Sequence, residues 1–93
     1  MDRYEGSARL EWWANRHTCL GSIEVRVLVV NDSSGWRATA AFTSPLIAED
    51  REAWTFLKDL SPYFTLRFED DEHATIEVRV DEPQQGELTL TAV

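Results

Sequence analysis

The sequence predicts an α+β fold: a curled, mainly antiparallel sheet of about six strands, in the order βββ-α-βββ, with one helix packed on one face. Three observations carry this prediction. Apolar and polar residues alternate in six separate runs, at the period of two that is typical of strands. One segment between the third and fourth runs has a helical period instead. The chain has 93 residues, which is one domain's worth, so we expect residues 1–93 to form a single domain.

Three alternating runs precede the helix, over residues 7–13, 23–30 and 36–42. In the first run, Ala8, Leu10 and Trp12 share one face, which we assign to the core. Residues 31–35 have the composition of a turn, so the second and third runs are expected to form a hairpin. We expect the loop of residues 16–20 to fill part of the core, with Cys19 as a small buried residue.

The period changes after Pro45, where four apolar residues recur at helical spacing: Ala53, Trp54, Leu57 and Leu60. Acidic residues precede them, as the positive end of a helix dipole favours. The start of the helix is open between Ser44, with proline at the first helical position, and Asp50 as N-cap. Pro62 is expected to end the helix, because the residue before a proline avoids helical geometry.

Alternation resumes over residues 64–69, 74–81 and 87–92. Six strands span about 25 Å at their usual spacing, whereas a helix is about 10 Å wide. One helix therefore cannot cover the whole sheet. Either the sheet curls towards a half-barrel or a second copy covers the remainder, so monomer and homodimer are both open. We favour curling.

Composition constrains the partners. The net charge is −8 and the sequence pI is about 4.6, so nucleic-acid phosphate and anionic membrane surfaces would repel the protein. A basic protein partner is compatible with this charge. The amino terminus has no apolar leader segment and no apolar run reaches the length of a membrane span. Together with the single cysteine, these features predict a cytoplasmic protein.

The densest acidic segment lies between two strong strands and comprises Glu69, Asp70, Asp71 and Glu72, which we call the acidic turn. Oxygen ligands suit Ca²⁺ or Mg²⁺, but the segment lacks the spacing and the glycine of a loop that wraps an ion. It is therefore interpreted either as a solvated hairpin turn or as a patch for a basic partner, and we predict no metal site.

Trp12 and Trp13 are neighbours on a strand, so they point to opposite faces of the sheet. With Trp12 in the core, Trp13 lies on the charged face. A partly exposed tryptophan can anchor a partner or stack on a sugar ring. The alternative is that Trp13 packs under the loop of residues 15–20 or over the stems of Arg26 and Arg37.

Catalytic motifs are weak, and the interpretation leans away from an enzyme. His17 and Cys19 lie two residues apart, but neither a helix start nor an oxyanion-forming turn follows the cysteine. The sequence has no Gly-x-Ser-x-Gly elbow and no phosphate-binding glycine loop. We assign no catalytic residue and no cofactor.

Three segments carry a resemblance to a known type of domain: Trp54-x-Phe56-Leu57-x-x-Leu60, then Phe64-x-Leu66, and the run from Asp71 to Val78. They resemble small bacterial domains that are mostly β with one helix. This resemblance implies no catalytic residues, and some such proteins act as immunity or accessory proteins.

Our first functional hypothesis is therefore a non-enzymatic bacterial protein–protein interaction module with an acidic surface. Its candidate partner-binding residues are Trp13 and the acidic turn. The alternative is small-ligand binding on the concave side of the sheet, lined by Trp36, Trp54 and Phe68.

Overall fold

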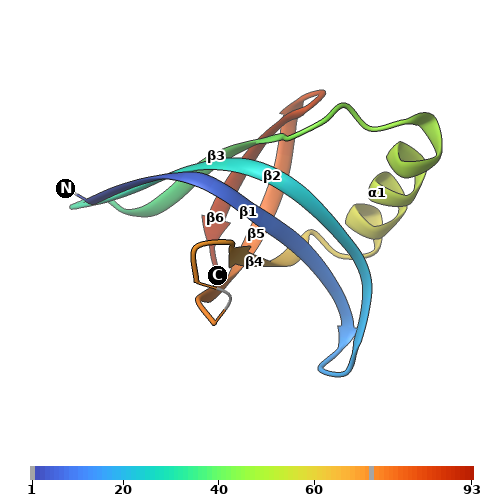
Figure 1. Cartoon of the computed structure of the whole chain (residues 1–93), viewed down its shortest axis with the longest axis horizontal. Helices are drawn as coiled ribbons and strands as arrows, with labels where there is room; N and C mark the ends of the chain where they lie inside the picture. The colour runs from blue at the N-terminus through green and yellow to red at the C-terminus, as the bar shows by residue number, and fades with distance from the viewer. Residues whose placement is uncertain (1, 72) are drawn as a thin grey trace.

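The computed structural model describes residues 2–71 and 73–93. Over these residues the predicted βββ-α-βββ order is confirmed. The elements are β1 (Asp2–Asn15), β2 (Thr18–Asp32), β3 (Gly35–Phe42), α1 (Ala48–Leu60), β4 (Tyr63–Phe68), β5 (Thr75–Gln84) and β6 (Glu87–Ala92). All neighbouring strands pair in the antiparallel sense, and Figure 1 shows α1 to one side of the strands.

The sheet is a closed barrel in the order β1-β2-β3-β6-β5-β4, which corrects the expected curled, open sheet. β1 closes it by pairing with β4, from Ala8 opposite Phe68 to Glu11 opposite Thr65. A second long-range pairing joins β3 to β6. Closure removes the free edge of the sheet where each strand pairs on both sides. It also removes the mismatch in width, because the inner face is covered by the barrel itself rather than by the helix.

The barrel interior is filled by the apolar positions of the alternating runs. Leu10, Leu66 and Leu90 are fully buried, and Val25, Val27, Val78 and Val80 are at most 1% exposed. Alanines at positions 8, 38 and 40 share this interior, because a six-stranded barrel is too narrow for a large side chain at every inward position. The predicted core face is thus confirmed, including Leu10.

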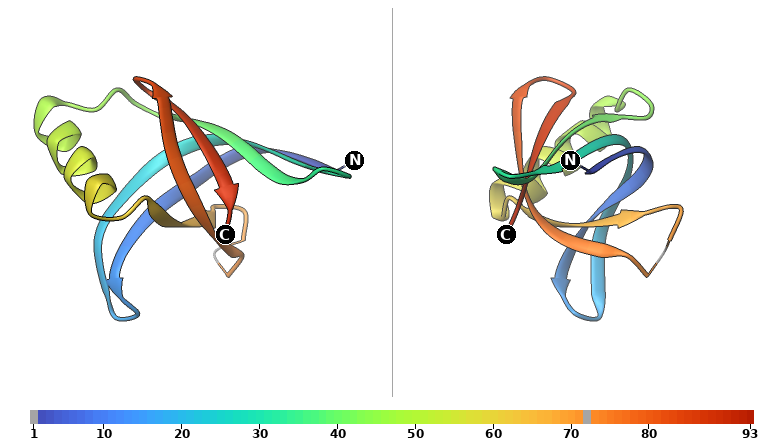
Figure 2. Two further views of the ribbon diagram at one scale, coloured as in Figure 1. Left: turned by 180° about the vertical axis from the view of Figure 1, so that it is seen from behind. Right: turned by 90° about the vertical axis from the view of Figure 1, so that its left-hand side faces the viewer.

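Helix α1 lies against one end of the barrel (Figure 2). Trp54 is its buried residue, and its ring centroid lies 5.3 Å from that of Phe42 and 5.0 Å from that of Phe64. Ala53 and Leu60, which the helical spacing had assigned to the core, are exposed. The helix therefore plugs the barrel end with one large aromatic side chain.

The helix ends where the sequence predicts, at Ser61, the residue before Pro62. Its start does not match either alternative. The N-cap is Ile47, with no side-chain cap hydrogen bond, rather than Ser44 or Asp50. The acidic first turn, with Glu49 and Asp50, still provides the favourable interaction with the helix dipole.

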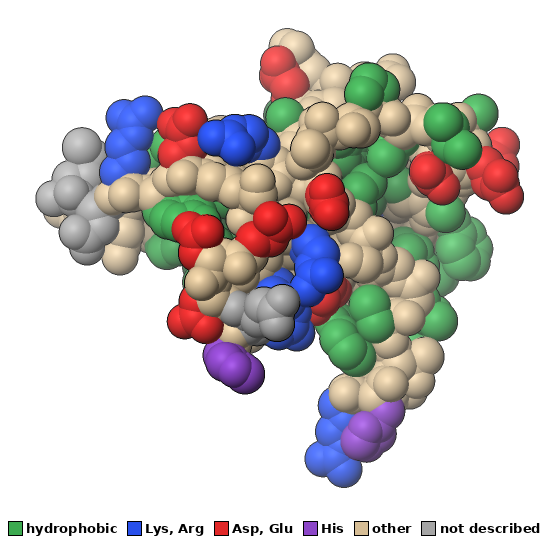
Figure 3. Space-filling model, viewed as in Figure 1, with side chains coloured by type: hydrophobic (Ala, Val, Ile, Leu, Met, Phe, Trp, Pro, Cys, Tyr) green, Lys and Arg blue, Asp and Glu red, His purple; other side chains and the backbone are tan. Residues whose placement is uncertain are grey.

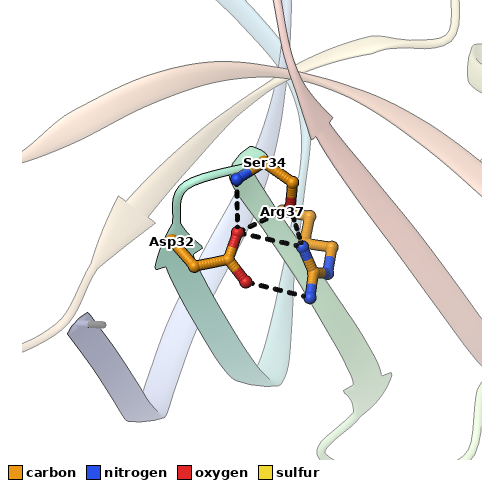
Figure 4. Close-up of polar contacts among 3 residues, drawn as sticks. All are labelled: Asp32, Ser34 and Arg37. Atoms are coloured by element: carbon orange, nitrogen blue, oxygen red, sulfur yellow. Dashed lines mark hydrogen bonds and ion pairs between the residues drawn. The ribbon is translucent and has the colours of Figure 1, made fainter.

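The turn between β2 and β3 is built by the residues that predicted it (Figure 4). Asp32 Oδ1 accepts hydrogen bonds from the Ser34 backbone N–H at 2.9 Å and from its hydroxyl at 2.6 Å. These bonds to Ser34, with Arg37 nearby, hold the pKa of Asp32 below its usual value. Gly35 follows with φ of 111°, a conformation that favours glycine.

The β1–β2 hairpin extends past the barrel wall. β1 pairs with β4 only as far as Glu11, but it pairs with β2 as far as Asn15 opposite Thr18. The last residues thus form a two-stranded ribbon, whose tip is at the lower right in Figure 1. Cys19 lies on this ribbon and is exposed, so the predictions of a buried cysteine and of a core-filling loop over residues 16–20 are wrong.

Candidate functional site

The projecting ribbon and α1 form the two walls of a groove, which we call the α1–hairpin groove. Its volume is about 270 Å³. Gly21 allows the walls to approach, because a Cβ atom there would lie 2.6 Å from Leu57 Cδ1. The lining is mostly apolar and consists of Leu10, Leu20, Gly21, Ser22, Ile23, Leu46, Asp50, Ala53, Trp54, Leu57 and Phe64.

Apolar side chains continue from this groove onto the solvent-facing side of α1. Leu20, Phe56 and Leu60 are 57%, 63% and 59% exposed. Positions 53, 56, 57 and 60 have the i, i+3, i+4, i+7 spacing of a single helix face. We call Leu20, Ala53, Phe56, Leu57 and Leu60 the apolar strip.

Acidic residues border the apolar strip. The exposed carboxylates on α1 are Glu49, Asp50, Glu52 and Asp59. In Figure 3, hydrophobic and acidic side chains are interspersed on the right-hand side of the molecule, the side on which Figure 1 places the helix. The combined surface is therefore both apolar and negatively charged.

The opposite side of α1 is fixed to the barrel by Glu82 of β5. Its carboxylate accepts hydrogen bonds from Arg51 at 2.8 Å, from Lys58 at 3.2 Å, from the Trp54 indole at 3.3 Å and from the Gly86 backbone N–H at 2.8 Å. Burial alone would raise the pKa of this carboxyl, but these four donors outweigh it and lower the pKa of Glu82 to about 2. The ionised carboxylate therefore holds one wall of the groove in place.

Trp13 lies outside the barrel, on the face opposite Trp12, as predicted. It is 37% exposed, and its indole N–H donates to Glu11 Oε1 at 3.2 Å. Arg67 Nε in turn donates to both Glu11 oxygens at 3.1 Å. Glu11 is 7% exposed, so its charge is buried. Trp13 is thus held by a hydrogen bond to the buried carboxylate of an ion pair.

The acidic turn lies between β4 and β5, and Glu72 is outside the described residues. Glu69, Asp70 and Asp71 are exposed. Asp70 accepts the Tyr4 hydroxyl at 3.0 Å, and Asp71 accepts the backbone N–H of His73 at 3.0 Å. Over residues 2–71 and 73–93, no three His, Cys, Asp or Glu side chains gather as a metal site.

The three aromatic residues of the ligand-binding alternative do not come together. Trp54 lines the α1–hairpin groove. Phe68 contacts Tyr4, with ring centroids 5.3 Å apart, and Trp36 pairs with Asn31 in the β2–β3 ladder. The concave surface on which they were expected to meet is the filled interior of the barrel.

No family model, no curated protein and no solved structure matches the chain. The helix of the described residues is too short and too polar to cross a membrane.

Sequence reasoning missed Glu82, which accepts four hydrogen bonds in the structure. It also missed the pairing of Glu11 with Arg67, since these residues are 56 positions apart. The sequence pattern that underlies the apolar strip was visible, because apolar residues recur along α1 at helical spacing. We had interpreted this pattern as a helix face that packs on the sheet.

Proposed function

We propose that this chain is a protein–protein interaction module that binds a basic amphipathic helix of a partner protein in the α1–hairpin groove. The observation that carries the proposal is the apolar strip, which leaves large aliphatic and aromatic side chains exposed beside a groove. Apolar surface gathered in this way on a small domain is typical of an interaction site.

The form of the partner follows from the spacing of the strip. Residues at i, i+3, i+4 and i+7 on one helix pack against a second helix through complementary ridges and grooves. Leu20, on the opposite wall, would contact the other side of the same partner helix. The groove would then receive one of its apolar side chains as an anchor.

The charge of the partner follows from the acids that border the strip. Glu49, Glu52 and Asp59 are exposed on the helix that carries the strip, so lysine or arginine on the flanks of the partner helix would be attracted. A second copy of this chain, with its net charge of −8, would be repelled. We therefore expect the protein to be a monomer, and sedimentation equilibrium is the measurement that checks this.

The test uses a synthetic helix of about 18 residues, long enough to be helical when bound, with leucine on one face and lysine on the other. We expect it to bind at least about tenfold more tightly than a scrambled peptide of identical composition. Replacing both Phe56 and Leu60 with serine should weaken binding by about tenfold or more, because both are large apolar side chains of the strip that are exposed to a partner. Fluorescence anisotropy measures each affinity.

A charge variant of the acidic turn, with Asp70→Asn and Asp71→Asn, is the matched control. It should retain the preference for the amphipathic peptide. If this variant loses binding while the serine variant keeps it, the acidic turn is the interface and the groove is not. Equal affinity for the scrambled peptide would reduce the interaction to charge alone and contradict the proposal.

A further inference from the structure

A second cleft opens on the other face of the β1–β2 ribbon. β4 and β5 continue along the barrel beyond the last β1–β4 pair, Glu11 opposite Thr65, whereas the ribbon turns away. The resulting space has a volume of about 380 Å³ and is lined by Trp13, Asn15, Arg16, Thr65, Arg67 and Glu77. We call it the Trp13 cleft. Figure 3 shows the lower edge of the molecule notched between the ends of the β1–β2 and β4–β5 hairpins.

We propose that the Trp13 cleft binds a neutral saccharide, with one sugar ring stacked on the indole of Trp13. This site lies on a different surface from the α1–hairpin groove, so the proposal does not depend on the function proposed above.

The first argument is that the aromatic side chain is held in position before any ligand arrives. Its N–H is bound to Glu11, and Glu11 is held by Arg67 at 3.1 Å. A ligand that stacks on this ring would not have to immobilise it, which lowers the entropic cost of binding. The electron-rich face of an indole attracts the weakly positive C–H groups of a sugar ring.

The second argument is the balance of charge. Of the lining residues, Arg16 and Glu77 carry opposite charges, and the charge of Arg67 is paired with that of Glu11. An anion would meet the carboxylates and a cation would meet the guanidinium groups, so neither is favoured. The cleft suits an uncharged ligand that both donates and accepts hydrogen bonds.

The third argument is the set of polar groups available for hydroxyls. The Thr65 hydroxyl donates to Glu77 Oε1 at 2.7 Å, which fixes both side chains while leaving oxygen lone pairs that accept. Asn15 Oδ1 accepts the backbone N–H of His17 at 2.8 Å. The two N–H donors of the Asn15 side-chain amide take no part in this bond and can donate to another acceptor. Donors and acceptors therefore lie beside an aromatic face, as recognition of a sugar ring requires.

The test is a titration followed by the indole N–H resonances of the protein, which has four tryptophans. The probes are glucose, N-acetylglucosamine, galactose, cellobiose, chitobiose and lactose. We expect at least one probe to shift the Trp13 indole resonance saturably, with a dissociation constant of about 1–10 mM. Trp13→Ala should weaken that probe at least about tenfold. Arg16→Ala, at an exposed turn residue, should weaken it severalfold without altering the fold.

Phe56→Ala, in the apolar strip, is the control and should leave saccharide affinity unchanged. The proposal is overturned if none of the six probes shifts the Trp13 resonance saturably up to about 50 mM, or if Trp13→Ala binds as well as the wild type. It is also overturned if sodium phosphate or tetramethylammonium binds the cleft more tightly than every sugar, since the site would then select charge.

Discussion

At the scale of single residues, Glu82 decides how α1 sits on the barrel. Two cationic side chains of the helix, Arg51 and Lys58, meet this one carboxylate, whose side chain is 8% exposed. The same carboxylate also accepts the N–H of Gly86, a residue at φ of 85° that closes the β5–β6 turn. One buried charge thus joins a helix, a strand and a turn, which a pattern of apolar residues cannot predict.

The lowered pKa of Glu82 makes part of the stability dependent on pH. The folded protein holds the carboxyl at a pKa of about 2, compared with 4.5 for the free group. The stabilisation is therefore fully present above about pH 4.5 and is lost as the pH falls towards 2; we expect it to be about 2–3 kcal/mol. Glu82→Gln should lower the free energy of unfolding by about 2 kcal/mol at pH 7.

Urea denaturation at a series of pH values measures this effect. The difference between wild type and Glu82→Gln should narrow as the pH falls from about 5 to about 3. Glu52→Gln, at an exposed position on the same helix, controls for the general loss of negative charge. A difference between wild type and Glu82→Gln that stayed constant with pH would show that the ionised carboxylate does not fasten the helix.

At the scale of elements, α1 is attached by few contacts. Trp54 is its buried residue, Leu57 packs beside Gly21 of β2, and the ion pairs of the helix with the barrel run through Glu82. The strands, in contrast, pair on both sides around the barrel. A helix held in this way should open locally at a lower free energy than global unfolding.

Hydrogen exchange tests this difference. Amides of α1 should exchange faster than those of β2 and β5, and Trp54→Ala should abolish most α1 protection while the barrel amides stay protected. Removing a buried tryptophan usually lowers the free energy of unfolding by about 3–5 kcal/mol. Here we expect the helix α1 to lose its local stability before the barrel does. Thr55→Ala, exposed on the same helix, should leave protection intact. Equal loss of protection in α1 and in the strands would mean that they unfold together.

At the scale of the whole molecule, closure depends on a short seam. Four residue pairs join β1 to β4, and the inward side chains of this seam include Leu10 and Leu66, both fully buried. Contacts between β1 and β4 span more than 50 positions in the sequence. Bringing these strands together costs loop-closure entropy, and the packing of the interior must offset that cost.

We therefore expect Leu66→Ala to lower the free energy of unfolding by about 2–5 kcal/mol, because it opens a cavity at the seam. Urea denaturation should show one transition with an unchanged m-value. Leu20→Ala, at an exposed position, should change stability by less than about 0.5 kcal/mol. Similar effects of the two variants would indicate that the seam does not support the barrel.

The sequence alone determined the strand periods, the order of the elements, the β2–β3 turn and the end of α1. It also determined that Trp12 and Trp13 point to opposite faces. These are local properties, set by backbone geometry within about ten residues. The alternation around Leu10 likewise identified the inward face of β1 before any partner strand was known.

Only the tertiary structure decided that the sheet closes, that the apolar strip faces solvent, and that Glu82 and Glu11 are buried. Closure depends on which distant strands pair, and alternation is the same for a curled sheet and for a barrel. The apolar strip has the same helical spacing as a core face, so exposure depends on how much of α1 the barrel end can cover. Both candidate sites lie where the β1–β2 ribbon leaves the barrel, a position set by strand pairing rather than by any single segment.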